Sequence, residues 1–114
     1  MADCLFCKIR DGQIPATKVH EDDLCFAIRD IKPQAPTHIL VIPKRHISTL
    51  NDVQAEDAPL VGHLLVVAKT IAAGEGHGEP GWRTVFNVNE QAGQTVFHIH
   101  LHVLGGRAFG WPPG

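Results

Sequence analysis

The sequence of 114 residues lacks any run of 18 or more consecutive apolar residues, so we expect no membrane-spanning helix. The segment 1–7 also lacks the basic and apolar regions of a secretory signal peptide. With only three cysteines, which cannot all pair internally, a disulfide framework is not expected. These absences predict a cytoplasmic protein without a membrane partner.

An excess of positive charge is also missing. Ten Lys and Arg against twelve Asp and Glu leave a formal net charge of −2. Proteins that coat nucleic acid present a strongly basic face, so we expect no nucleic-acid partner. This net charge still allows the protein to bind a single phosphorylated small molecule, because backbone N–H groups and neutral histidines hold phosphate without bulk positive charge.

The length and composition predict one domain over residues 1–114, because 44% apolar residues suffice for a core and no repeat or linker divides the chain. Hydrophobic patterning predicts a short helix at 4–10, strands at 18–21, 24–29, 38–42, 82–88 and 96–104, and a long helix within 53–73. The long helix is expected to begin near Asp57, which could cap it. Its predicted apolar stripe contains Val61, Leu64, Leu65, Ala68, Ile71 and Ala72. This order indicates an α+β fold, in which a helix covers an antiparallel five-stranded sheet.

Histidine is unusually abundant, with eight in the chain and three at alternate positions, His98, His100 and His102. On a strand these three side chains share one face, about 6.6–7 Å apart. The opposite face then carries the apolar residues Phe97, Ile99, Leu101 and Val103. A solvent-facing strand tolerates a single histidine, but three in unbroken alternation favour a functional site. Two chemistries use such a stripe: metal ligation, and nucleophilic catalysis in which an imidazole attacks and its neighbours orient it.

The segment 98–104 matches the pattern His-φ-His-φ-His-φ-φ, where φ is apolar, and resembles the histidine triad (HIT) family. Similarity to the Hint branch of that family extends over segments 30–31, 33–38, 42–47, 93–96 and 111–114. The resemblance implies a HIT-like fold and hydrolysis of the P–N bond of a purine nucleoside phosphoramidate, through a nucleotidyl-histidine intermediate. Related nucleotidyl transferases carry Gln in place of the third histidine, so His102 favours hydrolysis.

The same resemblance assigns the catalytic residues. It makes His100 the nucleophile that attacks phosphorus, with His98 and His102 beside it and His38 as an orienting partner. An imidazole with a pKa near 6.5 is largely neutral, hence nucleophilic, at physiological pH, and it is also a competent leaving group. A backbone carbonyl that accepts from one ring nitrogen would leave the other nitrogen free to attack.

The nucleotide-binding residues follow in the same way. The resemblance implies that the phosphate and leaving group contact Asn87, Gly93, Gln94 and Thr95, where Thr95 supplies a hydroxyl that many relatives have as serine. Asp30 is expected to accept from the ribose hydroxyls. The slot for the base is expected to consist of Leu5, Phe6, Ile9, Ile31 and Leu40. Without the resemblance, a polar loop and ordinary core packing would explain these residues.

Cys4 and Cys7 form a C-x₂-C pair, which is half of a possible zinc site. A closed structural site needs two more ligands, and we expect His46 and His98, because many bacterial relatives carry Cys, Cys, His and His at these places. Two free thiols are the alternative, and zinc is not required for the chemistry. Cys25 is expected to be a small core residue. No role is expected for His20, His63 and His77.

The resemblance further implies a homodimer. Leu60 and Val67 widen the apolar stripe of the long helix, and the segment 111–114 suits packing on a partner subunit. Other functions remain open at this point. The chain could be a nucleotide-binding or scaffolding module with little turnover, a zinc-only structural protein, or a dinucleoside polyphosphate hydrolase, against which Gly105 and Gly106 argue mildly.

Overall fold

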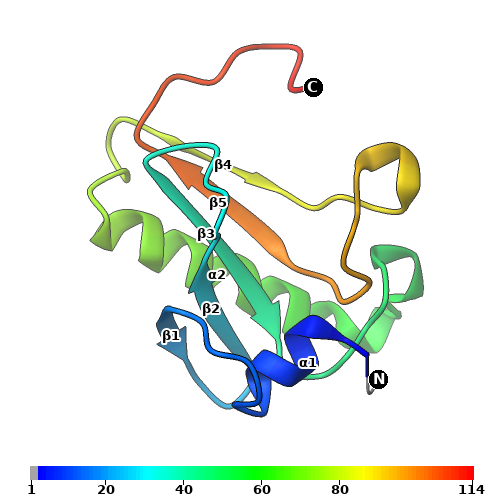
Figure 1. Ribbon diagram of the computed structural model, residues 1–114. Coiled ribbons are helices and arrows are strands. Elements are labelled where there is room, and N and C mark those ends of the chain that lie inside the picture. Colours follow the sequence, from blue (N-terminus) through cyan, green and yellow to red (C-terminus); the bar gives the residue numbers. More distant parts are fainter. Residues whose placement is uncertain (1–2) are drawn as a thin grey trace.

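The computed structural model describes residues 3–114 and contains two helices and a five-stranded sheet (Figure 1). The elements are α1 (Leu5–Arg10), β1 (Lys18–Glu21), β2 (Cys25–Arg29), β3 (Thr37–Pro43), α2 (Ala58–Gly74), β4 (Trp82–Val85) and β5 (Leu101–Gly105). The strands are antiparallel throughout, in the order β1-β2-β3-β5-β4. The predicted α+β fold is confirmed.

The sheet separates two apolar clusters. In Figure 1, α2 crosses behind the sheet, and the larger cluster fills the space between them. The smaller cluster, which includes Phe6 and Ile9 of α1, covers the opposite face. Because successive residues of a strand point to opposite faces, Leu101 and Val103 pack toward α2 while His102 points the other way. The sheet thus presents the end of the histidine segment to the α1 side.

The helix α2 begins where Pro59 permits, since proline is tolerated only in a first turn. Asp57 precedes it, but the predicted side-chain cap is wrong: the carboxylate accepts from the backbone N–H of Gln54 at 2.8 Å and from the Arg45 guanidinium. Both partners lie outside the helix, so the buried carboxylate joins the preceding turn to the end of β3.

The buried side of α2 matches the predicted stripe in part, since Leu65 is the member that the structure leaves exposed. Leu64, Val67, Ala68 and Ala72 are buried, whereas Leu65 is 44% exposed and Val66 is 58% exposed. The segment Ala55–Gly74 has a mean hydropathy of 1.2, which meets the length and composition of a membrane span. The buried side of this segment packs on the sheet, as in the core helix of a globular protein. Its length and hydropathy are therefore weak evidence for a membrane span.

Two predicted strands are shorter than expected. The strand predicted at 82–88 ends at Val85, and the one predicted at 96–104 begins at Leu101. In the irregular stretch before Leu101, the N–H of Ile99 donates to the carbonyl of Ile47 at 2.8 Å, in the loop after β3. Ile99 therefore reaches the core while Phe97, which was expected beside it, is 46% exposed.

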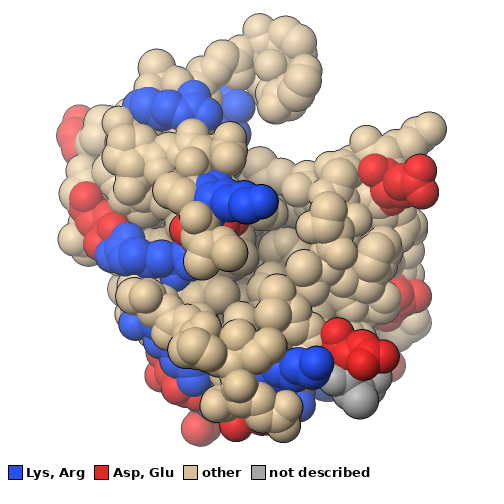
Figure 2. Space-filling view, in the orientation of Figure 1, with Lys and Arg blue, Asp and Glu red and all other residues tan. Residues whose placement is uncertain are grey.

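The charged residues do not form a surface patch of one sign on the face drawn in Figure 2. On this face, Lys and Arg are interspersed with Asp and Glu, and uncharged residues cover the rest of the surface. The C-terminal segment projects from the body of the molecule at the top of this view.

Candidate active site

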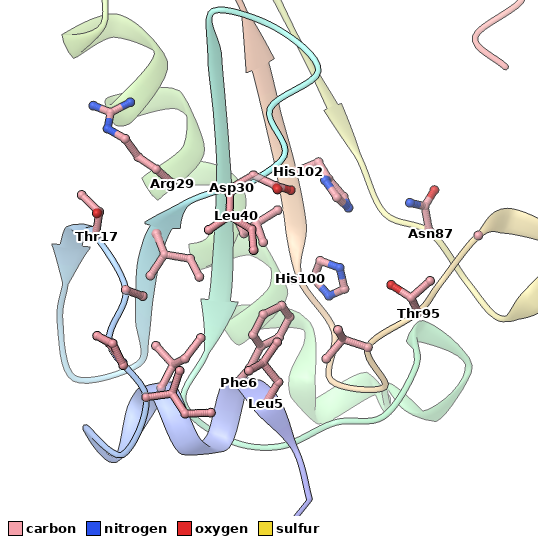
Figure 3. Close-up of a pocket in the computed structure, with 18 residues that line it drawn as sticks. Leu5, Phe6, Thr17, Arg29, Asp30, Leu40, Asn87, Thr95, His100 and His102 are labelled. Atoms are coloured by element: carbon pink, nitrogen blue, oxygen red, sulfur yellow. The ribbon is translucent and has the colours of Figure 1, made fainter.

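A cavity of about 710 Å³ opens on the face of the sheet opposite α2 (Figure 3). This volume lies in the usual range for small-molecule sites. Leu5, Phe6, Ile9, Ile31 and Leu40, the five residues predicted to hold a base, all line it. Asp30, Asn87, Gly93, Thr95, His100 and His102 supply its polar wall. The cavity therefore joins an apolar slot to a histidine-bearing wall.

His100 stands where the apolar and polar parts of the cavity meet. Its ring packs edge-on against Phe6, with the centroids 4.9 Å apart, and faces Thr95 in Figure 3. Its Nδ1 lies 2.8 Å from the backbone carbonyl of His98. A carbonyl can only accept, so Nδ1 carries the proton and Nε2 keeps its lone pair. This hydrogen bond leaves the lone pair of Nε2 free of a protein partner on the cavity side.

A chain of three groups fixes the tautomer of His102. The backbone N–H of Gln34 donates to Nδ1 of His38 at 3.0 Å, so the proton of the neutral His38 ring is on Nε2. That Nε2–H faces Nδ1 of His102 at 2.9 Å and donates to it. His102 must then carry its own proton on Nε2, which makes it a hydrogen-bond donor beside His100.

Burial keeps these histidines neutral. It lowers the pKa of His100, against a smaller opposing effect of the hydrogen bond to the His98 carbonyl. Burial, followed by the charges of His100 and His38, lowers the pKa of His102 to about 4. The pKa of His38 is also lowered by burial, although Asp30 opposes the shift. At neutral pH these three imidazole rings are therefore uncharged.

The remaining predicted binding residues differ in their surroundings. Asp30 accepts from the N–H of Lys32 at 2.8 Å, and its second oxygen lies 3.5 Å from Nε2 of His38. In Figure 3, Thr95 extends toward His100 from the far wall, and Asn87 lies on the same wall, closer to the level of His102. Gly93 adopts a φ of 86°, in the left-handed region that favours glycine. These groups leave the space next to His100 lined by hydroxyl, amide and carboxylate.

Gln94 does not line the cavity. Its side chain is buried, with Nε2 donating to the carbonyls of Ser48 and Val96 and Oε1 accepting from the N–H of Asn89. Its backbone N–H donates to the Asn89 carbonyl. The residue stabilises the loop that carries Gly93 and Thr95 and presents no side-chain group to the cavity.

His98 is fully buried and points away from the cavity. Its Nε2–H donates to the carbonyl of Pro43 at 2.7 Å, which leaves Nδ1 unprotonated. Burial lowers the pKa of this ring to about 4. His98 thus contributes its backbone carbonyl to His100 and directs its ring to a different cluster.

That cluster brings together the four residues predicted to bind zinc. Nδ1 of His98 lies 3.3 Å from Sγ of Cys4, 3.6 Å from Sγ of Cys7 and 3.1 Å from Nδ1 of His46. The four ligand atoms all lie within 4.8 Å of one another. Two sulfurs and two imidazole nitrogens are a donor set of structural zinc, and the His98–Pro43 hydrogen bond is the outer contact that such a ligand needs. The residues fit a Zn²⁺ ion.

Sequence reasoning missed Thr17 and Arg29, which also line the cavity. Arg29 ends β2, and its guanidinium pairs with the carboxylate of Glu75, 46 residues away, at 3.0 and 3.2 Å. No local pattern identifies such a long-range pair. Its charge is therefore already balanced at the rim of the cavity.

Comparisons with known proteins agree on one family. The profile of the HIT domain matches residues 11–109. The purine nucleoside phosphoramidase of Escherichia coli is 51% identical over 106 residues, covering 93% of this chain and 89% of that protein. A HIT-like protein of Synechococcus elongatus is 56% identical, covering 98% and 97% of the two chains. A crystal structure of a HIT family hydrolase from Legionella pneumophila, 59% identical, superposes with a TM-score of 0.97 and covers 98% of this chain and all of that one.

Proposed function

The chain belongs to the HIT domain family, and on this premise we propose that it is a hydrolase that cleaves the P–N bond of purine nucleoside phosphoramidates. The observation that carries the proposal is the hydrogen bond from Nδ1–H of His100 to the His98 carbonyl, which leaves Nε2 free in the cavity. The name of the Escherichia coli relative supports the substrate class.

In the first step, the Nε2 lone pair of His100 forms a bond to the α-phosphorus. The electrons of the P–N bond move to the leaving nitrogen, which takes up a proton from solvent and departs as an amine. The attached ring is cationic because Nδ1 keeps its proton, and the His98 carbonyl that accepts from Nδ1–H stabilises this charge. A cationic ring is a better leaving group than a neutral one, which favours the next step.

In the second step, water attacks the phosphorus and the N–P bond breaks. Its electrons return to Nε2 of His100, a proton passes to solvent, and the nucleoside monophosphate leaves. His102 donates from Nε2 to a phosphate oxygen as negative charge builds up in both steps. Thr95 is the hydroxyl that assists the departing amine, and Asp30 accepts from the ribose hydroxyls.

The base lies in the apolar slot against Phe6, Ile31 and Leu40. Ile31 is 93% exposed in the free chain and lines the cavity. A planar purine beside Ile31 would remove that surface from water.

We propose that Cys4, Cys7, His46 and His98 hold a structural zinc ion. When bound, the ion neutralises the thiolates and fixes His98, whose carbonyl in turn orients His100.

The thiols of the described residues are all free of disulfide bonds, and such thiols persist in a reducing compartment, which supports a cytoplasmic location.

We also propose that the protein is a homodimer. Leu65 and Val66 form an exposed apolar strip on α2, and Trp111 is 84% exposed in the projecting C-terminal segment. A second copy would cover this surface. Sedimentation at micromolar concentration should give a dimer, and a monomer alone would contradict the proposal.

The proposed function is tested by the turnover of adenosine 5′-phosphoramidate. We expect steady release of AMP by the wild-type protein and none above background by His100→Asn. His77→Gln is the matched control, because His77 lies outside the cavity and contacts Thr37. Normal nucleotide binding with negligible turnover would instead indicate a binding or scaffolding module. Preference for a dinucleoside polyphosphate would indicate that class of hydrolase.

A further inference from the structure

A second group of metal-binding side chains lies on the α2 side of the sheet. The ligand atoms of His20 at β1, Asp22 in the following turn and Cys25 at the start of β2 lie within 4.8 Å of one another. His63 on α2 reaches this group through the carboxylate of Asp22. In Figure 1, β1 is the edge strand beside β2, and α2 passes behind the sheet. None of these residues lines the cavity, and none belongs to the cluster of Cys4, Cys7, His46 and His98.

Three of these side chains approach one carboxylate oxygen of the fourth, Asp22. Nε2 of His20 and Nε2 of His63 each lie 2.7 Å from Oδ2 of Asp22, and Sγ of Cys25 lies 3.6 Å from the same oxygen. A single carboxylate oxygen offers about two lone-pair sites, so three donors crowd one acceptor. A cation among them would convert the competing donors into ligands.

Backbone irregularity turns His20 toward this group. Lys18 pairs with Ile28 and His20 pairs with Ala27, so two steps along β1 match one step along β2. Regular alternation would place Lys18 and His20 on the same face, but the bulge directs His20 to the face of Ala27, which packs toward α2. Bulges commonly re-aim a side chain next to a functional site.

The carboxylate of Asp22 is held in a fixed position. Its Oδ1 accepts from the backbone N–H groups of Leu24 and Cys25 at 2.8 and 2.9 Å. Oδ2 is therefore presented by a rigid turn. The side chains of His20 and His63 are each 31% exposed, so an ion can reach the group from solvent.

We propose that His20, Asp22, Cys25 and His63 form a second zinc site, which ties the edge strand β1 to α2. Two imidazole nitrogens, one thiolate and one carboxylate suit Zn²⁺, whereas Mg²⁺ and Ca²⁺ prefer oxygen ligands alone. Four protein ligands close a tetrahedral shell, so the role is structural. The site goes beyond the proposed hydrolase and does not depend on it.

The experiment is a zinc count by elemental mass spectrometry on the full-length protein, after dialysis against Zn²⁺ buffered at about the nanomolar level, within the affinity range of structural sites. We expect His63→Gln to hold one equivalent less than the wild-type protein. His20→Gln, on a different element, should show the same loss. His77 belongs to neither metal-binding cluster, so His77→Gln should hold as much zinc as the wild-type protein.

The thiol ligand is tested with Co²⁺ in the Cys4→Ser/Cys7→Ser protein, in which Cys25 is the remaining cysteine. A cobalt–thiolate charge-transfer band that disappears on adding His63→Gln supports the site. Zinc counts that are equal in the wild-type, His63→Gln and His20→Gln proteins would overturn it.

Discussion

The ring of His100 donates from Nδ1 to the backbone carbonyl of His98 at 2.8 Å, while the ring of His98 turns away toward Cys4 and Cys7. Two histidines two residues apart thus serve different purposes. The ring of His100 lines the cavity, where we propose that it attacks the substrate, and the ring of His98 lies in the proposed zinc cluster. Any change that shifts His98 is expected to disturb the orientation of His100.

Loss of the His102 donor should slow the chemical step. His102→Ala removes the Nε2–H that we propose contacts a phosphate oxygen, so kcat should fall by about 10²-fold, as is typical for one donor to developing charge. KM should change little. His102→Gln, which retains an amide donor, should recover part of the rate. Steady-state kinetics with adenosine 5′-phosphoramidate measures both variants, and an unchanged kcat for His102→Ala would contradict the assigned role.

The low pKa of His102 makes stability depend on pH. Burial and the neighbouring His100 and His38 lower this pKa to about 4, against the opposing effect of Asp30, whereas an unfolded histidine titrates near 6.5. Between these values the unfolded chain binds a proton that the folded chain does not. The stability linked to this group is therefore complete above pH 6.5 and declines as pH falls toward 4.

Urea unfolding at about pH 7 and about pH 5 tests this dependence. The wild-type protein should lose more of its free energy of unfolding between the two conditions than His102→Gln, which has no titrating group at this position. Equal losses in the two proteins would mean that His102 titrates normally in the folded chain.

The first zinc cluster should contribute directly to stability. In His63→Gln protein, which lacks a ligand of the second site, removal of metal should act through Cys4, Cys7, His46 and His98 alone. We expect a chelator to lower Tm by about 10 °C or more, because each kcal/mol shifts the midpoint of a domain this small by about 4–8 °C. Cys4→Ser in the same background should show a much smaller response. A chelator without effect on Tm would favour two free thiols.

Much of the fold was predictable because local patterns carry it. The helix at Leu5–Arg10 and the strand at Lys18–Glu21 follow from nearby glycine, proline and turn residues. The apolar face of α2 was predicted less well, because Leu65 and Val67 are equally apolar and only packing on the sheet determines which one is buried. Sequence periodicity does not distinguish them.

The site was predicted from the resemblance to the HIT family and from the alternation of histidines along the expected strand. Strict alternation would have given His98, His100 and His102 one shared environment. The backbone before Leu101 is not a regular strand, however, and His98 lies in a different cluster from the other two. His20 and His63 were given no role, because their meeting at Asp22 depends on a bulge in β1 and on a contact across 41 residues. Neither feature has a signature in the local sequence.

The central claim is that Nε2 of His100 becomes covalently bonded to phosphorus. Its most direct test is rapid acid-free quenching during turnover of a slow adenosine phosphoramidate, followed by mass spectrometry of the peptide that contains residues 98–102. We expect an added adenylyl group on His100 in the wild-type protein and none in His100→Asn. Turnover without a nucleotide on this peptide, or with the nucleotide on another residue, would contradict the account.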